Sequence, residues 1–323
     1  MFILTGGAGF IGSCVLKTLN ERGINEIIVV DRLRDKSKWK NLNGKNFHDF
    51  VDKDKFLDYI KEDAFTFMTD AFIHMGACSS TTERNADYLM KNNYQYSRIL
   101  TEYCVKKGIR MIYASSAATY GSGEHGFSDS NETMVKLLPV NAYGFSKHVF
   151  DKWANYSGNL DHICGLKFFN VFGPNEYHKE DMSSVVYKAY KQIMENGSLK
   201  LFKSDHPDYE DGMQMRDFVY VKDCAEVVWK LINNPAQNGI YNVGTGKPRT
   251  WIDLGNAVFK AMGKEPSIQF IEMPEKLKGK YQYYTCADNA KLNASPSSHD
   301  FMSLEDSVKD YVINYLQKDF MHC

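Results

Sequence analysis

One stretch near the first residue constrains the fold more than any other. An apolar run over residues 3–5 breaks into a glycine-rich turn and then into a helical pattern, with Gly6, Gly9 and Gly12 spaced three apart. At such positions the missing side chains permit a tight turn, close approach of backbone N–H groups to a pyrophosphate, and close packing of a helix on a strand. The stretch therefore predicts a dinucleotide-binding turn.

The residues after this turn continue the same unit. A helix is expected up to Gly23, and residues 26–31 form a second apolar run that ends in Asp31, 19 residues after Gly12. An acid at this place in a βαβ unit binds the ribose hydroxyls of a dinucleotide. The alternative is an ordinary glycine-rich loop between a strand and a helix. The second strand with its terminal acid favours the dinucleotide site.

A basic cluster after Asp31 bears on the choice between NAD and NADP. Its members are Arg32, Arg34, Lys36, Lys38 and Lys40. A loop at this place lies where the 2′-phosphate of NADP would sit, and Arg32 or Lys38 can pair with a phosphate. Asp31 itself favours the free 2′-hydroxyl of NAD, and most of the cluster is expected to be a solvated loop. On balance the cluster predicts NADP.

Strand and helix patterns alternate over the first half of the chain. Strands are expected over residues 71–78, 110–114 and 163–169, and helices over residues 56–60, 83–107 and 142–156. This alternation predicts an α/β fold with a doubly wound parallel sheet, which binds ligands at the carboxyl ends of its strands. Small residues at one strand end, Gly76 and Ala77, allow a cofactor to pass close to the backbone.

The alternation loosens after residue 174, which indicates a second lobe. The expected elements there are a helix over 183–195, an acidic loop over 205–211, a strand over 217–221, a helix over 225–232, a strand over 240–243 and a terminal helix over 304–316. The section from 217 to 243 is expected to return to the first lobe. We therefore expect a dinucleotide-binding domain of residues 1–174 plus 216–247 and a smaller α/β substrate-binding lobe of residues 175–215 plus 248–323.

Charge and cysteine content exclude several classes of protein. With 39 basic and 40 acidic side chains, the 323 residues carry a net charge of −1, so no nucleic acid or membrane partner is indicated. The seven cysteines include no C-x-x-C pair, which argues against a disulfide framework and against a zinc site. No run approaches about 18 apolar residues, and no basic segment precedes the first apolar run. A soluble, cytoplasmic protein without a metal is expected.

A tyrosine and a lysine carry the expected chemistry. Tyr143 and Lys147 are four residues apart, and therefore lie one turn apart on the helix expected over 142–156. A nearby lysine stabilises a phenolate, which can act as a base toward a sugar hydroxyl while a nicotinamide takes the hydride. Ser116, at the end of the preceding strand, is expected to hold the same hydroxyl. The spacing alone is weak and also fits a surface pair, but its order behind the glycine turn favours catalysis.

These motifs together resemble the extended short-chain dehydrogenase/reductase superfamily, in its nucleotide-sugar-modifying branch. Four further segments resemble the ADP-L-glycero-D-manno-heptose 6-epimerase family, namely residues 76–83, 92–97, 169–174 with His178 and Lys179, and 277–282. The resemblance covers nearly the whole chain. It implies epimerisation at C6 of an ADP-heptose through a transient 6-keto sugar, with tightly bound NADP, in lipopolysaccharide core heptose biosynthesis.

The glycine turn and the resemblance together imply roles for individual residues. Those expected to face NADP are Gly6, Gly9, Phe10, Ile11, Gly12, Asp31, Arg32, Lys38, Lys53, Met75, Gly76, Ala77, Cys78, Ser79, Asn92, Tyr143, Lys147, Val171 and Lys179. Those expected to face the ADP-heptose are Ser116, Asn170, Asp181, Lys188, Phe202, Lys203, Ser204, Asp205, Arg216 and Tyr281. Family members form homo-oligomers, typically pentamers, and the same is expected here.

The resemblance assigns the acid/base work to Tyr143 and Lys179. In the two poses of the sugar the reacting oxygen lies at different places, so a base is useful on each side. Lys147 and Ser116 are expected to support Tyr143. The alternative for Lys179 is an exposed loop lysine without a catalytic role.

Related activities fit these residues less well. Dehydratases of the superfamily carry an acidic pair just after the strand serine, and GDP-fucose-synthase-like enzymes carry a cysteine base there, whereas this chain has Ala117 and Ala118. On the sugar-nucleotide side, Arg216 has a planar fork for a phosphate or hydroxyls. Lys276, Lys278 and Lys280 either attract the pyrophosphate or form a solvated basic turn. Two alternatives stay open: an NAD-dependent UDP-sugar 4-epimerase and a non-catalytic NADP-sensing Rossmann protein.

Overall fold

A parallel seven-stranded sheet forms the centre of the molecule. The computed structural model describes residues 1–34, 37–275 and 281–323. Lys36, Lys276, Lys278 and Lys280 lie outside the described residues, as does most of the segment 277–282. The strands run in the order β11-β6-β5-β4-β1-β2-β3. Their bounds are β1 (Phe2–Thr5), β2 (Ile27–Asp31), β3 (Asp49–Asp52), β4 (Ala71–His74), β5 (Met111–Ser116), β6 (Ile163–Phe168) and β11 (Gly239–Val243).

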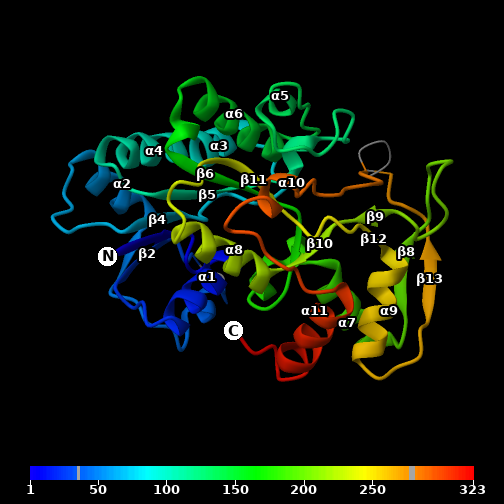
Figure 1. Ribbon diagram of the computed structural model, residues 1–323. Coiled ribbons are helices and arrows are strands. Elements are labelled where there is room, and N and C mark those ends of the chain that lie inside the picture. Colours follow the sequence, from blue (N-terminus) through cyan, green and yellow to red (C-terminus); the bar gives the residue numbers. More distant parts are fainter. Residues whose placement is uncertain (35–36, 276–280) are drawn as a thin grey trace.

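Helices cover both faces of this sheet (Figure 1). One face carries α2 (Lys53–Lys61), α4 (Tyr96–Lys107) and α6 (Ala142–Tyr156), and the other carries α1 (Phe10–Glu21) and α8 (Val221–Ile232). Successive side chains of a strand point to opposite faces. Ile3 accordingly belongs to the core under α2, α4 and α6, and Leu4 to the core under α1 and α8. A strand buried on both faces needs the continuous apolar run that β1 has.

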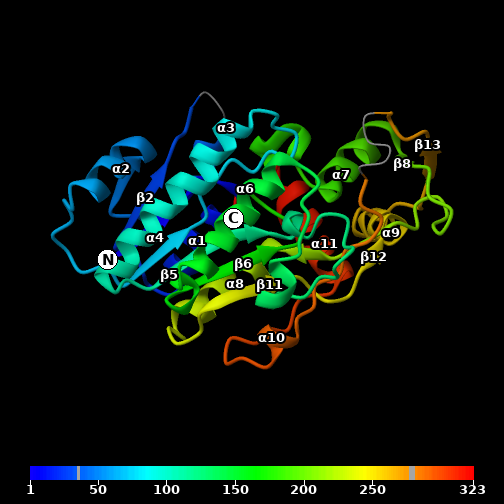
Figure 2. The same ribbon diagram turned by 90° about the horizontal axis from the view of Figure 1, so that it is seen from above.

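A smaller group of elements extends the molecule beyond the sheet, at the right of Figure 1. It contains the strand pairs β8 (Leu199–Phe202) with β13 (Ile268–Ile271) and β9 (Met215–Arg216) with β12 (Arg249–Thr250), and the helices α7 (Val185–Asn196), α9 (Trp251–Ala261) and α11 (Leu304–Tyr311). A third pair joins β7 (Asn170–Phe172) to β10 (Phe218–Tyr220). Short helices are α3 (Ala86–Leu89), α5 (Asn131–Met134) and α10 (Ala290–Asn293). Figure 2 shows the β8–β13 pair at the end of the molecule away from β2.

The doubly wound parallel sheet expected from the sequence is confirmed. The helix expected over 142–156 has the same bounds in α6, because the side chain of Asn141 caps it by accepting from Gly144 N. The helix expected over 83–107 is wound as α3, a π turn and α4, and begins at Ala86 behind the cap Asn85.

The boundary expected near residue 221 is wrong. The expected strand 217–221 is shorter and pairs with β7 outside the main sheet, and α8 begins at Val221 instead of 225. Residues 218–225 are apolar at both strand and helix spacing, so the pattern did not separate the two elements. None of the helices formed by the described residues combines the length and the apolar character that crossing a bilayer requires.

Asp217 ties the segment before α8 to two distant turns. Its buried carboxylate accepts from the backbone N–H groups of Thr245, Gly246 and Ala287 at 2.7–2.9 Å and from the Thr245 hydroxyl at 2.7 Å. Asp217→Ala would leave these four donors without their acceptor, in a site that is buried at Ala287 and partly buried at Thr245 and Gly246. We expect it to lower the free energy of unfolding by about 3–5 kcal/mol, as measured by urea denaturation.

The exposed Asp300 provides the control for this substitution. Asp300→Ala is expected to change the free energy of unfolding by less than about 0.5 kcal/mol, as surface substitutions usually do. Equal losses in both variants would contradict the role given to Asp217.

Candidate active site

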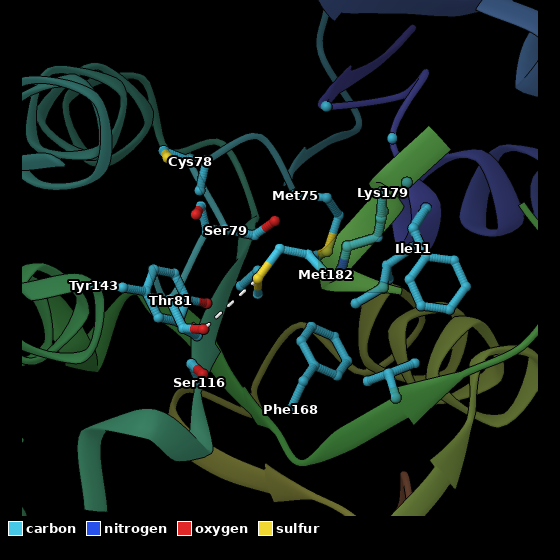
Figure 3. A pocket seen from close by; sticks show the side chains of 18 of the residues that line it. Ile11, Met75, Cys78, Ser79, Thr81, Ser116, Tyr143, Phe168, Lys179 and Met182 are labelled. Atoms are coloured by element: carbon cyan, nitrogen blue, oxygen red, sulfur yellow. Dashed lines mark hydrogen bonds between the residues drawn. The ribbon is translucent and has the colours of Figure 1, made fainter. Parts of the chain in front are cut away.

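A cavity of about 690 Å³ opens at the carboxyl ends of the central strands. The chain winds outward from β1 through β2 to β3, and then crosses to β4 on the other side of β1. Ligands of doubly wound sheets bind at such a reversal of strand order. The glycine turn after β1, the segment after β4 and the end of β5 line the cavity, which Figure 3 shows from close by.

The glycine turn leaves room that side chains would fill. Gly6 has φ of +71°, and a Cβ built on it would lie 2.5 Å from the nitrogen of Gly76. A Cβ on Gly12 would lie 2.2 Å from the carbonyl oxygen of Gly6. The turn therefore requires glycine at both positions, and its free backbone at the start of α1 fits a pyrophosphate.

Gly12→Ala is expected to weaken cofactor binding. The added methyl group must displace the backbone of the turn, and overpacking of this kind costs about 1–3 kcal/mol, equivalent to about 5–150-fold in the dissociation constant. The dissociation constant is measured by titration of the cofactor-free protein with NADP. Gly44→Ala is the control, because Gly44 lies outside the cavity lining and has open space around it, and it should leave binding unchanged. Equal binding by both variants would contradict this role of Gly12.

Every residue predicted to face the cofactor lines this one cavity. The apolar part of the lining includes Phe10, Ile11, Met75 and Val171. The segment after β4 contributes Cys78 and Ser79. Residues that sequence reasoning missed on this side include Leu33, Tyr88 and Tyr96.

Basic side chains gather at the end of the cavity that follows β2. The carboxylate of Asp31 accepts from Ala8 N at 3.0 Å, from Arg32 N at 2.6 Å and from Lys38 Nζ at 2.6 Å. Lys53 bonds to Asn92, and its pKa is lowered by burial and by the nearby charges of Arg32 and Arg34. The charge of Asp31 is thus compensated by Lys38, Arg32 forms an ion pair with Asp54, and Lys53 lies close to the charges of Arg32 and Arg34.

Tyr143 and Lys147 lie on the buried face of α6, 8% and 4% exposed. Burial raises the pKa of the Tyr143 phenol, and a hydrogen bond from Ser116 opposes this by stabilising the phenolate. Lys147 Nζ donates to the carbonyl oxygen of Ala114 at 2.8 Å, and burial lowers the pKa of the Lys147 ammonium to about 8. Lys147 is therefore mostly charged at neutral pH. The tyrosine, the lysine and the serine come together as predicted.

Lys179 enters the cavity from the wall opposite Tyr143 (Figure 3). It belongs to the 3₁₀ helix η5 (Tyr177–Met182), and its Nζ lies 5.4 Å from the ring centroid of Phe10. Burial lowers the pKa of Lys179, and the negative charge of Glu176 opposes this. A lysine with a lowered pKa releases its proton more readily, so burial makes Lys179 a better proton donor than a solvated lysine.

A polar contact joins two walls of the cavity near these groups. The Thr81 hydroxyl lies 3.7 Å from the sulfur of Met182, as the dashed line in Figure 3 marks. Thr81 follows β4 and Met182 ends η5. The two segments thus meet over the cavity between Tyr143 and Lys179.

The residues predicted to face the sugar nucleotide are more scattered. Ser116 and Asn170 line the cavity. Arg216 and Tyr281 are not among the lining residues, but both contact Trp251, which is: the Arg216 guanidinium is 5.7 Å from the Trp251 ring and 5.2 Å from the Tyr281 ring. Trp251 Nε1 also donates to the Tyr281 hydroxyl at 2.7 Å.

The other predicted substrate residues lie outside the cavity lining. Lys188 donates to the backbone oxygen of Asp181 at 2.6 Å, and Lys203 pairs with Glu272 at 2.7 Å. Phe202 ends β8, and Ser204 and Asp205 follow it. Their roles toward substrate stay predictions.

Residues that sequence reasoning missed on the side of the cavity near Asn170 include Trp251, Gln282 and Thr285. One local signal was available: Thr250 and Asp253 form a capping box, which marks Trp251 as the first residue of a helix. It predicts a helix start and carries no information about the cavity.

Comparison with known proteins agrees with this geometry. The model of the NAD dependent epimerase/dehydratase family matches residues 2–244. The chain is 57% identical over 316 residues to the ADP-L-glycero-D-manno-heptose-6-epimerase of Nitratidesulfovibrio vulgaris, covering 98% of each chain. Among solved structures, the Helicobacter pylori ADP-L-glycero-D-manno-heptose-6-epimerase superposes with a TM-score of 0.83 at 29% identity, covering 97% of this chain and 95% of that one.

A related enzyme with a different reaction has the same fold. The Thermus thermophilus UDP-glucose 4-epimerase, solved in complex with NAD, has a TM-score of 0.75 at 25% identity, covering 96% of this chain and 97% of that one. The resemblance drawn from the sequence is confirmed by the full-length likeness to the heptose epimerases. The chain belongs to the NAD dependent epimerase/dehydratase family and, within it, to the ADP-L-glycero-D-manno-heptose-6-epimerases.

Proposed function

We propose that this chain interconverts ADP-D-glycero-D-manno-heptose and ADP-L-glycero-D-manno-heptose at C6 with tightly bound NADP. The observation that carries the proposal is the placement of two proton-transfer groups, Tyr143 and Lys179, on opposite walls of one cavity with a dinucleotide turn at its base. The full-length likeness to curated heptose epimerases supports the choice of sugar nucleotide.

The residues of the chain can perform this inversion without net oxidation. In one pose the Tyr143 oxygen takes the proton of the C6 hydroxyl, while the Lys147 ammonium stabilises the phenolate and Ser116 orients the hydroxyl. When bound, the nicotinamide supplies a reversible hydride acceptor for C6. The 6-keto sugar then turns about its C5–C6 bond, and its carbonyl oxygen faces Lys179, which exchanges the proton in the second pose.

The test of this function is direct. Purified protein is incubated with ADP-D-glycero-D-manno-heptose, and the two C6 epimers are followed by NMR. Approach to a mixture of both epimers is expected. No exchange with this sugar but exchange of UDP-glucose with UDP-galactose would favour the 4-epimerase, and no exchange with either would favour a cofactor sensor.

The preference for NADP over NAD is the second part of the proposal. It is supported by the charge balance after β2, where Lys38 already compensates Asp31 and further cations surround the site. Lys38→Met removes one partner of a phosphate and frees Asp31 to repel it. Charged hydrogen bonds contribute about 1.5–3 kcal/mol, so NADP affinity is expected to fall about 10–150-fold while NAD affinity stays within about threefold.

The measurement is the dissociation constant of each cofactor for the cofactor-free protein. Lys40→Met is the control, since Lys40 is exposed on the same turn, and it should change neither constant. Tighter binding of NAD than NADP by the wild type would contradict the preference.

Two further features are proposed with their support. We propose a division into two domains, residues 1–174 plus 216–247 and residues 175–215 plus 248–323, because β11 is an edge strand of the main sheet while β8 and β13 pair outside it.

We also propose a cytoplasmic homo-oligomer, a pentamer by family resemblance. Large exposed apolar side chains such as Leu138, Val140 and Phe145 support association, and free cysteines fit a reducing compartment. Light scattering measures the oligomeric state.

A further inference from the structure

A buried ion pair lies next to the catalytic helix face, and the proton transfers described above do not use it. Asp151 Oδ2 on α6 and Lys167 Nζ on β6 are 2.9 Å apart, and the two side chains are 0% and 1% exposed. Burying two charges is expensive, and apolar residues of similar size often stabilise a core as well or better. Stability alone therefore does not account for this pair.

The pair connects the elements that carry the site. Asp151 accepts from the Tyr113 hydroxyl at 3.0 Å and from the Ser115 hydroxyl at 2.7 Å, both on β5. Lys167 donates to the Thr119 hydroxyl at 2.5 Å, in the turn that follows Ser116. Asp151 thus joins α6 to the strand end that presents Ser116, and Lys167 joins β6 to the turn beside it.

Asp151 also acts on Lys147 through its charge. It follows Lys147 by four residues in α6, so the two side chains are neighbours on one face. Its carboxylate raises the pKa of Lys147 against the lowering caused by burial, and Cys78 from the segment after β4 acts in the same direction. His74 on β4 also faces Lys147; its pKa is lowered to about 3 by burial and by the charge of Lys147, so it is neutral.

Lys167 also lies close to an aromatic ring and acts on a histidine. Its Nζ lies 5.0 Å from the ring centroid of Tyr120, and its charge contributes to lowering the pKa of His148 to about 4, mainly a result of burial. His148 is therefore neutral above that pH. Asp151 forms an ion pair with Lys167 and acts on Lys147 through its charge, so the presence of Lys167 changes how strongly Asp151 acts on Lys147.

We propose that Asp151 and Lys167 are positioning residues for the epimerisation, with Asp151 keeping Lys147 in its ammonium form and Lys167 setting how strongly it does so. This inference rests on the proposed function. The ammonium form matters because only a charged Lys147 stabilises the Tyr143 phenolate. A neutral Lys147 would leave Tyr143 a weak base near neutral pH.

The experiment compares the pH dependence of kcat/KM in the wild type, Asp151→Asn and Lys167→Met. In Asp151→Asn, Lys147 loses a nearby negative charge, so the midpoint of the alkaline fall in kcat/KM (the alkaline limb) should move to a pH about one unit lower. Activity relative to the wild type should then be about fivefold lower at pH 8 and less than about twofold lower at pH 6. Lys167→Met leaves Asp151 uncompensated and should move the limb up. Lys167→Arg keeps the charge and should restore the wild-type limb.

A purely structural pair would give a different result. Substitutions would then lower activity by the same factor at every pH, and unchanged limbs in both folded variants would overturn the proposal, as would shifts in the same direction. Thermal unfolding and cofactor binding establish that each variant is folded. If Asp151→Asn does not fold, the comparison of Lys167→Met with Lys167→Arg decides alone, with an unshifted limb in Lys167→Met counting against the proposal.

A second readout separates this inference from the proposed function. In protein labelled with ¹⁵N at lysine Nζ, the Lys147 signal is assigned by its loss in Lys147→Met and titrated by NMR without substrate. Asp151→Asn should lower the titration midpoint and Lys167→Met should raise it. If the wild type does not exchange the epimers but the midpoint shifts are present, the epimerase function is refuted and the electrostatic role of Asp151 and Lys167 stands. If the epimers exchange but the midpoints do not shift, that electrostatic role is refuted.

Discussion

Tyr143→Phe is expected to lower the rate of epimer exchange about 10²–10⁴-fold, the range that a positioned acid or base contributes. The substitution removes only the hydroxyl, so the ring that lines the cavity stays in place. NADP affinity should stay within about threefold, because the dinucleotide turn is untouched. The rate is measured by NMR exchange between the two sugar nucleotides.

Tyr156→Phe is the matched control for this prediction. Tyr156 lies on the same helix but is 70% exposed, so its hydroxyl should not affect the rate. A Tyr143→Phe variant that keeps more than about a tenth of wild-type activity would mean that another group performs the proton transfer.

Lys179→Met is expected to reduce epimer exchange by a similar factor, about 10²–10⁴-fold, for a complementary reason. Methionine keeps much of the apolar stem and removes the amine, so the sugar loses its proton partner in one pose only. Oxidation from the other pose should remain. Quenching single turnovers with hydroxylamine traps the 6-keto sugar as an oxime, which mass spectrometry detects.

The two variants should therefore form oxime from opposite epimers. Lys179→Met is expected to oxidise the epimer whose hydroxyl faces Tyr143, and Tyr143→Phe the epimer whose hydroxyl faces Lys179. Lys191→Met, a substitution of an exposed lysine on α7, should behave as the wild type. Oxime from the same epimer in both variants would contradict the division of roles.

The cofactor side of the site could be predicted because its determinants are local. A missing Cβ at Gly6 and Gly12 and an acid at the end of β2 act through backbone positions that neighbouring residues define. The spacing of Tyr143 and Lys147 needs only a helix, and Asn141 starts that helix where the pattern placed it. Such features depend little on packing between distant segments.

The substrate side could not be predicted in the same way. Three lining residues, Trp251, Gln282 and Thr285, belong to segments beyond the regular alternation of strands and helices. Their positions depend on how the short strand pairs β9–β12 and β8–β13 pack. Short strands of two to four residues carry almost no periodic signal. The sequence marks Arg216 as a candidate because of its guanidinium group, but only the structure shows that Arg216 contacts Trp251 and is not itself among the residues that line the cavity.

The ion pair of Asp151 and Lys167 illustrates the same limit. Sequence places Asp151 one turn after Lys147, yet its partner belongs to β6 and faces it because of the β5–β6 register, in which Ser115 pairs with Lys167. The edge strand β3 was missed for a related reason, since two of its four residues are aspartates and its strand conformation comes from pairing with β2.

The most direct test of the central claim follows a hydrogen atom. ADP-D-glycero-D-manno-heptose carrying deuterium at C6 is mixed with unlabelled sugar nucleotide and converted in ordinary water, and the products are analysed by NMR and mass spectrometry. We predict that the inverted product keeps its deuterium at C6, with no loss to solvent and no crossover between molecules. Replacement of the label by a solvent proton would contradict an account in which the same hydride leaves and returns within one cavity.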